Sequence, residues 1–178
     1  DQTREMKEAF YKAVPQVKNR DFILFLGRIH PKKGVDNLVR AFSEIDAGDL
    51  SLVVAGPGAD TEYGKELKAY VSDKSLDDKI LFPGMLEGAS KWGAFYESQV
   101  FILPSHQENF GIAVAEAMAC KKPVLISDKV NIWREISATK CGYVKPDTLE
   151  GTKELLEDWV CTSDGVKAEM IKNARSAF

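Results

Sequence analysis

The sequence predicts an α/β protein: a doubly wound, mostly parallel sheet of six strands with helices on both faces. Six short runs rich in β-branched and aromatic residues recur along the chain of 178 residues. Their apolar character is nearly continuous and does not alternate, which is typical of strands that helices cover on both faces. The segments between them carry apolar residues at helical spacing, so crossover helices are expected to join parallel strands.

The predicted elements alternate from the N-terminus, where the first twelve residues are polar and helix-prone. The six predicted strands are Phe22–Leu26, Ser51–Ala55, 79–82, Val100–Leu103, 123–127 and Gly142–Lys145. Helical spacing marks three crossover segments, which contain Leu38, Ala41, Phe42 and Ile45, then Tyr63, Leu67, Tyr70 and Val71, then Ile112, Ala115, Met118 and Ala119. Two more helices close the chain, one with Leu155, Leu156, Trp159 and Val160 and one with Val166, Met170 and Ile171.

Composition and charge narrow the class of protein. The chain carries 24 Lys and Arg against 27 Asp and Glu, so its net charge of -3 gives no overall attraction to nucleic acid or a membrane surface. An apolar fraction of 44% excludes a disordered chain, and no apolar run approaches the roughly 20 residues of a membrane helix. We expect one domain over residues 1–178. No secretory leader pattern opens the chain, so the cytoplasm is the expected location.

The three cysteines suit neither a disulfide framework nor a zinc ligand set, because they are odd in number and widely spaced. We expect Cys120, Cys141 and Cys161 to be buried as small apolar residues. Free thiols also fit a reducing compartment.

Basic residues gather directly after the first predicted strand. The segment 27–34, with the sequence GRIHPKKG, carries three cations within six residues where the chain enters a helix. A helix N-terminus already has partial positive charge, so Lys32 and Lys33 oppose the dipole unless an anion lies between them. Arg28 offers a planar fork that suits phosphate, and lysine adds a point charge. The segment predicts a diphosphate site, and a solvated basic loop is the alternative.

Two glutamates lie eight residues apart after the fourth predicted strand, in the segment 108–116 (ENFGIAVAE). Gly111 lets a ligand approach the first helical turn, whose free N–H groups can hold an anion. If the segment is all helical, the carboxylates of Glu108 and Glu116 lie about 12 Å apart, too far for hydrolysis through one shared water. Because carboxylates accept from hydroxyls, they suit a sugar and a ribose better than a metal pair.

Structural alternatives accompany both glutamates. Glu108 alternatively caps the helix, and Glu116 alternatively forms an ion pair with Lys121 or Lys122. The small neighbours of Glu116 favour close packing of its helix on another group.

Three further residues near the motifs have two interpretations each. His30 and His106 are placed to donate to a phosphate or sugar oxygen, although a loop histidine without a role is preferred for His30. Trp133 is either a stacking platform for a sugar ring or a helix-packing residue, and packing is preferred. The segment 56–61 (GPGADT) starts like a dinucleotide fingerprint but has threonine in place of the third glycine, so a tight strand-to-helix turn is predicted there.

Taken in chain order, the motifs resemble the group 1 (family 4) retaining glycosyltransferases. The resemblance is to the C-terminal Rossmann-like domain of that family and covers nearly the whole chain. It rests on Phe25-Leu26-Gly27-Arg28, Lys33-Gly34, Val53-Val54-Ala55-Gly56, Phe82-Pro83-Gly84, Leu103-Pro104-Ser105 and the two glutamates Glu108 and Glu116.

The resemblance implies one half of a GT-B architecture, in which two Rossmann-like domains face each other across a cleft. The chain is then the half that holds the nucleoside diphosphate sugar, and an N-terminal acceptor domain is expected outside residues 1–178. The implied partners are the donor and that domain, with no nucleic acid, and with membrane association only through the other half. The intact enzyme is expected to transfer the sugar to a hydroxyl with retention, whereas the isolated domain is expected to bind the donor and hardly turn over.

The resemblance also assigns roles at the site. Arg28 and Lys33 are implied to hold the diphosphate and stabilise the leaving phosphate, which with Glu108 makes them the catalytic candidates. Glu108 is implied to contact the donor sugar, and Glu116 is implied to receive the ribose hydroxyls. The other candidate donor contacts are Gly27, Gly56, Gly84, Met85, Leu86, His106, Asn109, Phe110, Gly111 and Ile112. No metal and no cofactor is implied.

One segment departs from the family pattern. Residues 128–135 (DKVNIWRE) stand where the family commonly has a paired-glycine loop before a glutamate, so the contacts to the sugar are expected to differ. Two other functions are alternatives to transfer: a stand-alone nucleotide-binding module, and an NAD-dependent oxidoreductase domain. The second needs the intact glycine fingerprint, which this sequence lacks.

Overall fold

The computed structural model describes residues 1–177 and confirms the predicted α/β class. Its six strands are all parallel and lie in the order β3-β2-β1-β4-β5-β6. The strands are β1 (Phe22–Leu26), β2 (Ser51–Ala55), β3 (Ile80–Gly84), β4 (Val100–Leu103), β5 (Val124–Ser127) and β6 (Gly142–Lys145). The helices are α1 (Arg4–Ala13), α2 (Val35–Glu44), α3 (Glu62–Asp73), α4 (Gly88–Glu97), α5 (Ile112–Ala119), α6 (Trp133–Thr139), α7 (Leu149–Cys161) and α8 (Asp164–Ala177), with 3₁₀ turns η1 (Pro15–Val17) and η2 (Pro31–Lys33).

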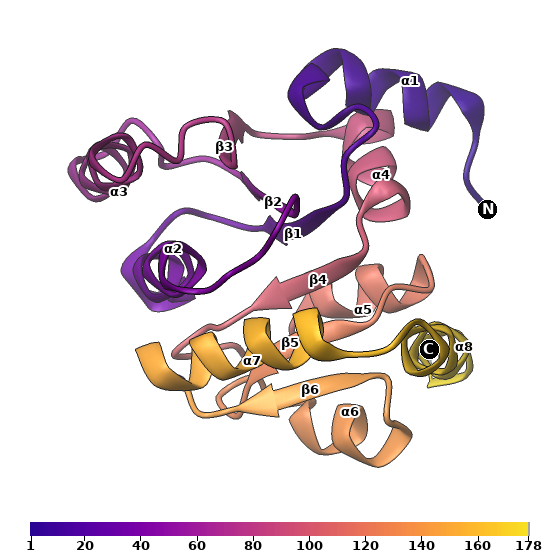
Figure 1. Ribbon diagram of the computed structural model, residues 1–178. Coiled ribbons are helices and arrows are strands. Elements are labelled where there is room, and N and C mark those ends of the chain that lie inside the picture. The colour runs from indigo at the N-terminus through magenta and orange to yellow at the C-terminus, as the bar shows by residue number, and fades with distance from the viewer. Residues whose placement is uncertain (178) are drawn as a thin grey trace.

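The sheet lies between two layers of helices (Figure 1). Helix α2 packs against α3 and α7 on one face, while α1 packs on α4, and α8 packs on α5 and α6, on the other face. The central strands are buried almost throughout, which confirms the interpretation of their continuous apolar runs. Within residues 1–177 no helix is both long enough and apolar enough to span a bilayer.

The third strand differs most from its predicted bounds. It begins at Ile80 and continues to Gly84, two residues past the predicted end, because Ala55 of β2 pairs with Gly84. Pro83 is tolerated there since β3 is an edge strand, where one missing N–H breaks no ladder.

Helix α4 was not singled out by the sequence, and its packing explains why. Gly93 lies so close to α1 that a Cβ there would come within 2.1 Å of the Met6 carbonyl oxygen. Because the residue at the closest contact is glycine, the buried face of α4 lacks an apolar side chain there. The helical spacing of apolar residues that would predict this helix is therefore weak. Helix α6 was also not predicted, because its seven residues form fewer than two helical turns and are too few to show a periodic apolar pattern.

The cysteine prediction holds for two of the three residues. Cys120 and Cys141 are buried, and burial raises the pKa of both thiols. Cys161, the last residue of α7, is exposed, which contradicts the prediction.

The order of the strands defines where a ligand site belongs. Strands β1 and β4 are neighbours in the sheet although they are far apart in the chain. After β1 the chain turns to one face through α2, and after β4 it turns to the other face through α5. In open α/β sheets the carboxyl edge at such a switch point is where ligands bind, so the site is sought there.

Candidate functional site

The loops that follow β1 and β4 are locked together at the switch point. The carbonyl of Lys32 accepts hydrogen bonds from the His106 N–H, at 2.8 Å, and from the Ser105 hydroxyl, at 3.0 Å. Gly34 has a φ of 68°, and a Cβ there would lie 2.2 Å from the Pro104 carbonyl oxygen. Only glycine fits this contact, so the predicted basic segment is held against the segment that carries the first glutamate.

The lysine of the first motif and the first glutamate of the second form an ion pair. Lys33 Nζ contacts Glu108 Oε2, and the two side chains are 24% and 19% exposed. The backbone of Glu108 is fixed in turn by a bridge to Val130: its N–H donates to the Lys129 carbonyl, and its own carbonyl accepts from the Asn131 N–H. Two predicted catalytic residues are thus brought together, and each neutralises the other.

Glu116 lies in the second turn of α5 and pairs with Lys91 of α4, with Nζ and Oε1 separated by 2.6 Å. The alternative partners were therefore wrong: Lys122 donates to the carbonyls of Tyr96 and Ser98, and Lys121 lies nearest Asp1.

The first half of the glutamate segment is not helical, because α5 begins only at Ile112. Gly111, with a φ of 65°, occupies the N-cap, so Glu108 does not cap the helix as the alternative supposed. The separation of about 12 Å that an unbroken helix would give therefore does not describe the two carboxylates.

A cavity of about 390 Å³ lies at the carboxyl ends of β1, β2 and β3. Five predicted donor or catalytic residues line it, namely Gly27, Arg28, Gly56, Met85 and Leu86. Arg28 is exposed and forms no ion pair or side-chain hydrogen bond with any residue in 1–177. An arginine without a counter-ion at the wall of a cavity is a suitable arrangement for binding an anion.

Lys91 also lines this cavity and was not among the residues predicted from the sequence. Its ammonium lies between Glu116 and the face of Trp92, 5.1 Å from the ring centroid. A single lysine in a helix gives no motif, so only the contact between α4 and α5 reveals its place at the site.

The remaining predicted residues lie apart from the cavity wall, most of them in the segment after β4. Phe110 and Ile112 are 68% and 66% exposed, Asn109 is also exposed, and Gly111 is buried beneath them. Gly84 ends β3 with a φ of 82° and open space around it. Met85 is 62% exposed. Together with Phe110 and Ile112 it leaves apolar surface open to solvent at the edge of the site.

The two histidines and Trp133 have structural contacts. His30 Nδ1 accepts from the Lys32 N–H at 3.1 Å and caps η2, so its ring has a structural contact within its own loop. His106 Nδ1 lies 2.8 Å from a carboxylate oxygen of Asp147. Trp133 packs against the core with the Arg134 guanidinium 4.5 Å from its ring centroid, as the packing interpretation expected.

The segment 56–61 forms the tight turn that the sequence predicted. A Cβ at Gly58 would come within 2.6 Å of the Ile29 carbonyl oxygen, which ties this turn to the loop after β1. The Thr61 hydroxyl caps α3 by accepting from the Gly64 N–H at 3.1 Å. Threonine thus serves as a helix cap at the position where a dinucleotide fingerprint has glycine.

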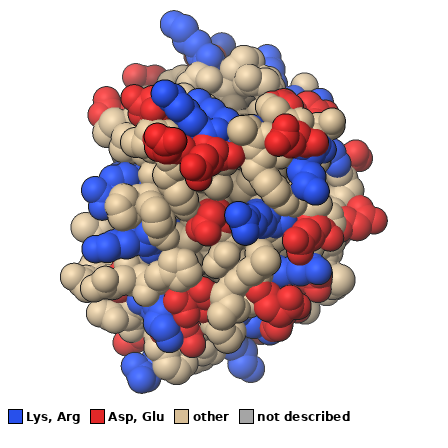
Figure 2. Space-filling view, turned by 90° about the vertical axis from the view of Figure 1, so that its left-hand side faces the viewer, with Lys and Arg blue, Asp and Glu red and all other residues tan. Residues whose placement is uncertain are grey.

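The carboxyl edge of the sheet is not a uniform basic surface. The strand arrows point to the left in Figure 1, and Figure 2 views that side of the molecule. Lys and Arg side chains are interspersed there with Asp and Glu (Figure 2). Lys33 and Lys91 are both paired with glutamates. Of the three cations Arg28, Lys33 and Lys91, only Arg28 therefore has no counter-ion.

Comparisons with known proteins agree with the fold and the motifs. A family model described as glycosyl transferases group 1 matches residues 6–177. An uncharacterized glycosyltransferase of Methanocaldococcus jannaschii is 29% identical over 177 residues, which cover 96% of this chain and 43% of that protein. A D-inositol 3-phosphate glycosyltransferase of Xylanimonas cellulosilytica is 32% identical over 167 residues, covering 87% of this chain and 37% of that protein. The chain spans less than half the length of these relatives.

Solved structures share the fold over nearly the whole chain. The C-terminal domain of a glycosyl transferase group 1 family protein from Francisella tularensis has a TM-score of 0.81 at 22% identity, covering 99% of this chain and 92% of that one. Anabaena HepE in complex with UDP and glucose has a TM-score of 0.83 at 17% identity, covering 99% of this chain and 47% of that one. These likenesses confirm a Rossmann-like domain of the kind found in GT-B structures.

Proposed function

The chain belongs to the group 1 glycosyl transferases, and on that premise we propose that it binds a nucleoside diphosphate sugar at the carboxyl edge of its sheet. In the intact enzyme the sugar passes to a hydroxyl acceptor with retention of its anomeric configuration. Residues 1–178 form the C-terminal donor domain, and an N-terminal domain that holds the acceptor faces them across a cleft. The greater length of the relatives supports such a further domain.

One observation carries the proposal: the cavity of about 390 Å³ places Arg28 beside the glycine backbone at the ends of β1 and β2. The planar fork of an arginine without a counter-ion suits a diphosphate, because it can contact two phosphate oxygens at once. Met85 and Leu86, at the end of β3, supply apolar surface for the base.

The two glutamates complete the donor site on either side of the diphosphate. Glu116 accepts from the ribose hydroxyls, and Lys91 holds its carboxylate in place through their ion pair. Glu108 accepts from the hydroxyls of the donor sugar. Arg28 and Lys33 stabilise the charge that develops on the leaving diphosphate, which is the main electrostatic contribution of this domain to catalysis.

Binding requires an exchange of partners at Lys33. In the structure its ammonium faces Glu108, so the diphosphate must replace this carboxylate as counter-ion. The released Glu108 is then available to the sugar hydroxyls, which couples the phosphate contact to the sugar contact. Without the acceptor domain the bound donor has no positioned nucleophile, and the isolated chain is expected to turn over slowly.

Calorimetric titration of the chain with UDP, GDP and ADP tests the proposal. UDP comes first because the Anabaena structure holds that nucleotide. We expect one of the three to bind in a one-to-one complex and Glu116→Gln to weaken it about tenfold, since one hydrogen-bonded contact to the ribose is lost. Glu66→Gln, an exposed residue of α3, is the matched control and is expected to change nothing. Absence of any binding at millimolar nucleotide would reject the proposal for this chain.

The substitution Glu108→Gln is expected to act in the opposite direction on the nucleotide alone. Removing the carboxylate frees Lys33 for the phosphates, so nucleoside diphosphate affinity is expected to rise about fivefold, or about 1 kcal/mol for a partly buried ion pair. Affinity for the nucleotide sugar should fall instead, because the neutral amide of glutamine is a weaker acceptor for the sugar hydroxyls than a carboxylate. Equal losses for both ligands would show that Glu108 maintains the loop and does not compete with phosphate.

A further inference from the structure

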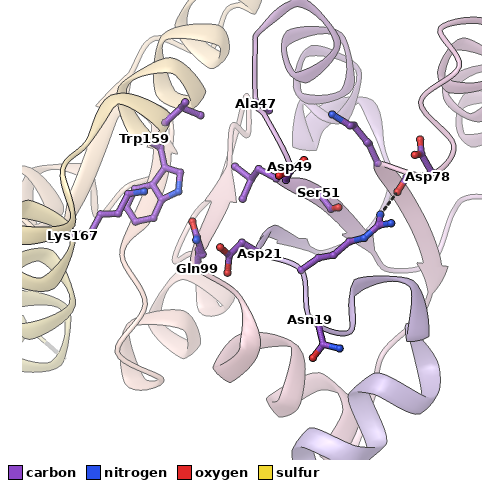
Figure 3. A pocket seen from close by; sticks show the side chains of 13 residues that line it. Asn19, Asp21, Ala47, Asp49, Ser51, Asp78, Gln99, Trp159 and Lys167 are labelled. Carbon is purple, nitrogen blue, oxygen red and sulfur yellow. Dashed lines mark hydrogen bonds between the residues drawn. The ribbon is translucent and has the colours of Figure 1, made fainter.

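A second cavity, of about 670 Å³, lies at the opposite edge of the sheet from the proposed donor site. Its walls come from the segments before β1, β2, β3 and β4 and from helices α7 and α8 (Figure 3). No residue of this wall also lines the cavity beside Arg28. Parallel sheets usually bind ligands at their carboxyl ends, so a large opening at the amino ends needs its own explanation.

Two buried polar atoms of the wall have no hydrogen-bond partner. Ser51 and Trp159 are each 1% exposed, and neither the Ser51 Oγ nor the Trp159 Nε1 is paired. In Figure 3 the nitrogen of the Trp159 ring lies on the side that faces the cavity. Buried polar groups are costly without a partner, and native proteins nearly always supply one. Neither atom is open to solvent in this structure, so a group in the cavity reaches it only when the neighbouring side chains move.

The cations of the wall are already engaged. Lys79 donates to the Gly48 carbonyl at 2.7 Å, and Arg20 donates to the Asp78 carbonyl at 3.2 Å. The ammonium of Lys167 lies over the Trp159 ring, 4.6 Å from its centroid. An incoming anion would therefore have to break these contacts.

The carboxylates of the wall are unengaged in the described part of the chain. Asp21 and Asp49 form no ion pair or side-chain hydrogen bond with residues 1–177, and the amide of Gln99 lies beside Asp21 in Figure 3. These groups accept hydrogen bonds, whereas the indole N–H of Trp159 can only donate. A ligand that satisfies both must carry donors and acceptors together, which hydroxyl groups do.

We propose that the cavity at the amino edge of the sheet binds a neutral polyhydroxylated ligand, a mono- or disaccharide in class. Its hydroxyls donate to Asp21 and Asp49 and accept from the indole N–H of Trp159. The wall balances three aspartates against three Lys and Arg side chains, which favours a neutral ligand over a charged one. This site is separate from the donor site and does not depend on the function proposed above.

Nuclear magnetic resonance of the indole N–H signals tests the site directly, because the chain has only three tryptophans. Trp92→Phe, Trp133→Phe and Trp159→Phe assign the three signals. Titration with glucose and with sucrose is expected to shift the Trp159 signal in a saturable way, at concentrations on the order of millimolar. Asp49→Ala is expected to weaken this response at least about tenfold, as loss of a charge-assisted hydrogen bond would. Asp60→Ala, an exposed residue of the turn before α3, is expected to leave it unchanged.

Three outcomes would overturn the inference. The first is a Trp159 signal that does not respond in a saturable way to either sugar up to about 100 mM. The second is a response that Asp49→Ala leaves unchanged, or that spermidine produces in place of the sugars. The third is loss of the response in Arg28→Ala, which would assign it to the donor site. Failure of UDP to bind would not affect any of these results.

Discussion

Replacing Arg28 with alanine is expected to weaken nucleoside diphosphate binding by about 30-fold to 100-fold. The guanidinium lines the cavity without a counter-ion among residues 1–177, so it can contact phosphate with no competing bond to break. Charge-assisted hydrogen bonds contribute about 1.5–3 kcal/mol each, and two parallel bonds from one arginine add geometric specificity. Calorimetric titration of the variant against the unmodified chain measures the loss.

Two further variants separate charge from geometry in the Arg28 result. Arg28→Lys keeps the positive charge but lacks the planar fork, so an intermediate loss is expected. Arg4→Ala removes an exposed arginine of α1 and is expected to have no effect on nucleotide affinity. If Arg28→Ala binds within about twofold of the unmodified chain, Arg28 does not contact the diphosphate.

Replacing Gly56 with alanine is expected to lower the free energy of unfolding by about 3 kcal/mol or more. Gly56 has a φ of 146°, and a Cβ there would lie 1.8 Å from the Gly27 carbonyl oxygen. Neither backbone can yield easily, because the Gly56 N–H donates to the Gly84 carbonyl and the Gly27 N–H donates to the Ala55 carbonyl. Both backbone strain and a steric clash therefore oppose the side chain.

Urea denaturation measures the Gly56 effect, with Gly165→Ala as the matched control. A Cβ at Gly165 meets no atom within 4 Å, so alanine there is expected to raise stability by about 0.5 kcal/mol through helix propensity. For a chain of this size the Gly56 loss corresponds to a fall of roughly 6–12 °C in the melting temperature. A Gly56→Ala variant as stable as the unmodified chain would contradict the close approach of β1 and β2 at the site.

The Gly56 variant also connects stability with binding. The same contact that excludes a side chain holds the loop after β1, and with it Arg28, at the cavity. A Gly56→Ala protein that still folds is therefore expected to lose nucleotide affinity, while Gly165→Ala keeps it. Measuring both stability and nucleotide affinity of the two variants distinguishes a displaced loop after β1 from a general loss of stability.

Local patterns in the sequence were enough to predict the six strands, all helices except α4 and α6, and most residues of the edge where the site lies. Uninterrupted apolar runs such as Leu52–Ala55 fix a strand buried on both faces, because each residue alone would be costly to expose. Glycines next to strand ends, together with the cations of residues 27–34, marked the carboxyl edge as the place for chemistry. These signals are local, so a single sequence contains them.

Which charges meet, and which groups remain without a partner, depends instead on how the elements pack in three dimensions. Lys91 and Glu116 are 25 residues apart, and Lys33 and Glu108 are 75 apart, so no spacing rule links them. The Trp159 N–H has no hydrogen-bond partner because of where α7 packs, beside the amino ends of the strands, and this position is not encoded in any local pattern. A strand or helix is encoded by neighbours along the chain, whereas an ion pair or a buried unpaired donor depends on how several elements pack, and that packing follows from the whole fold.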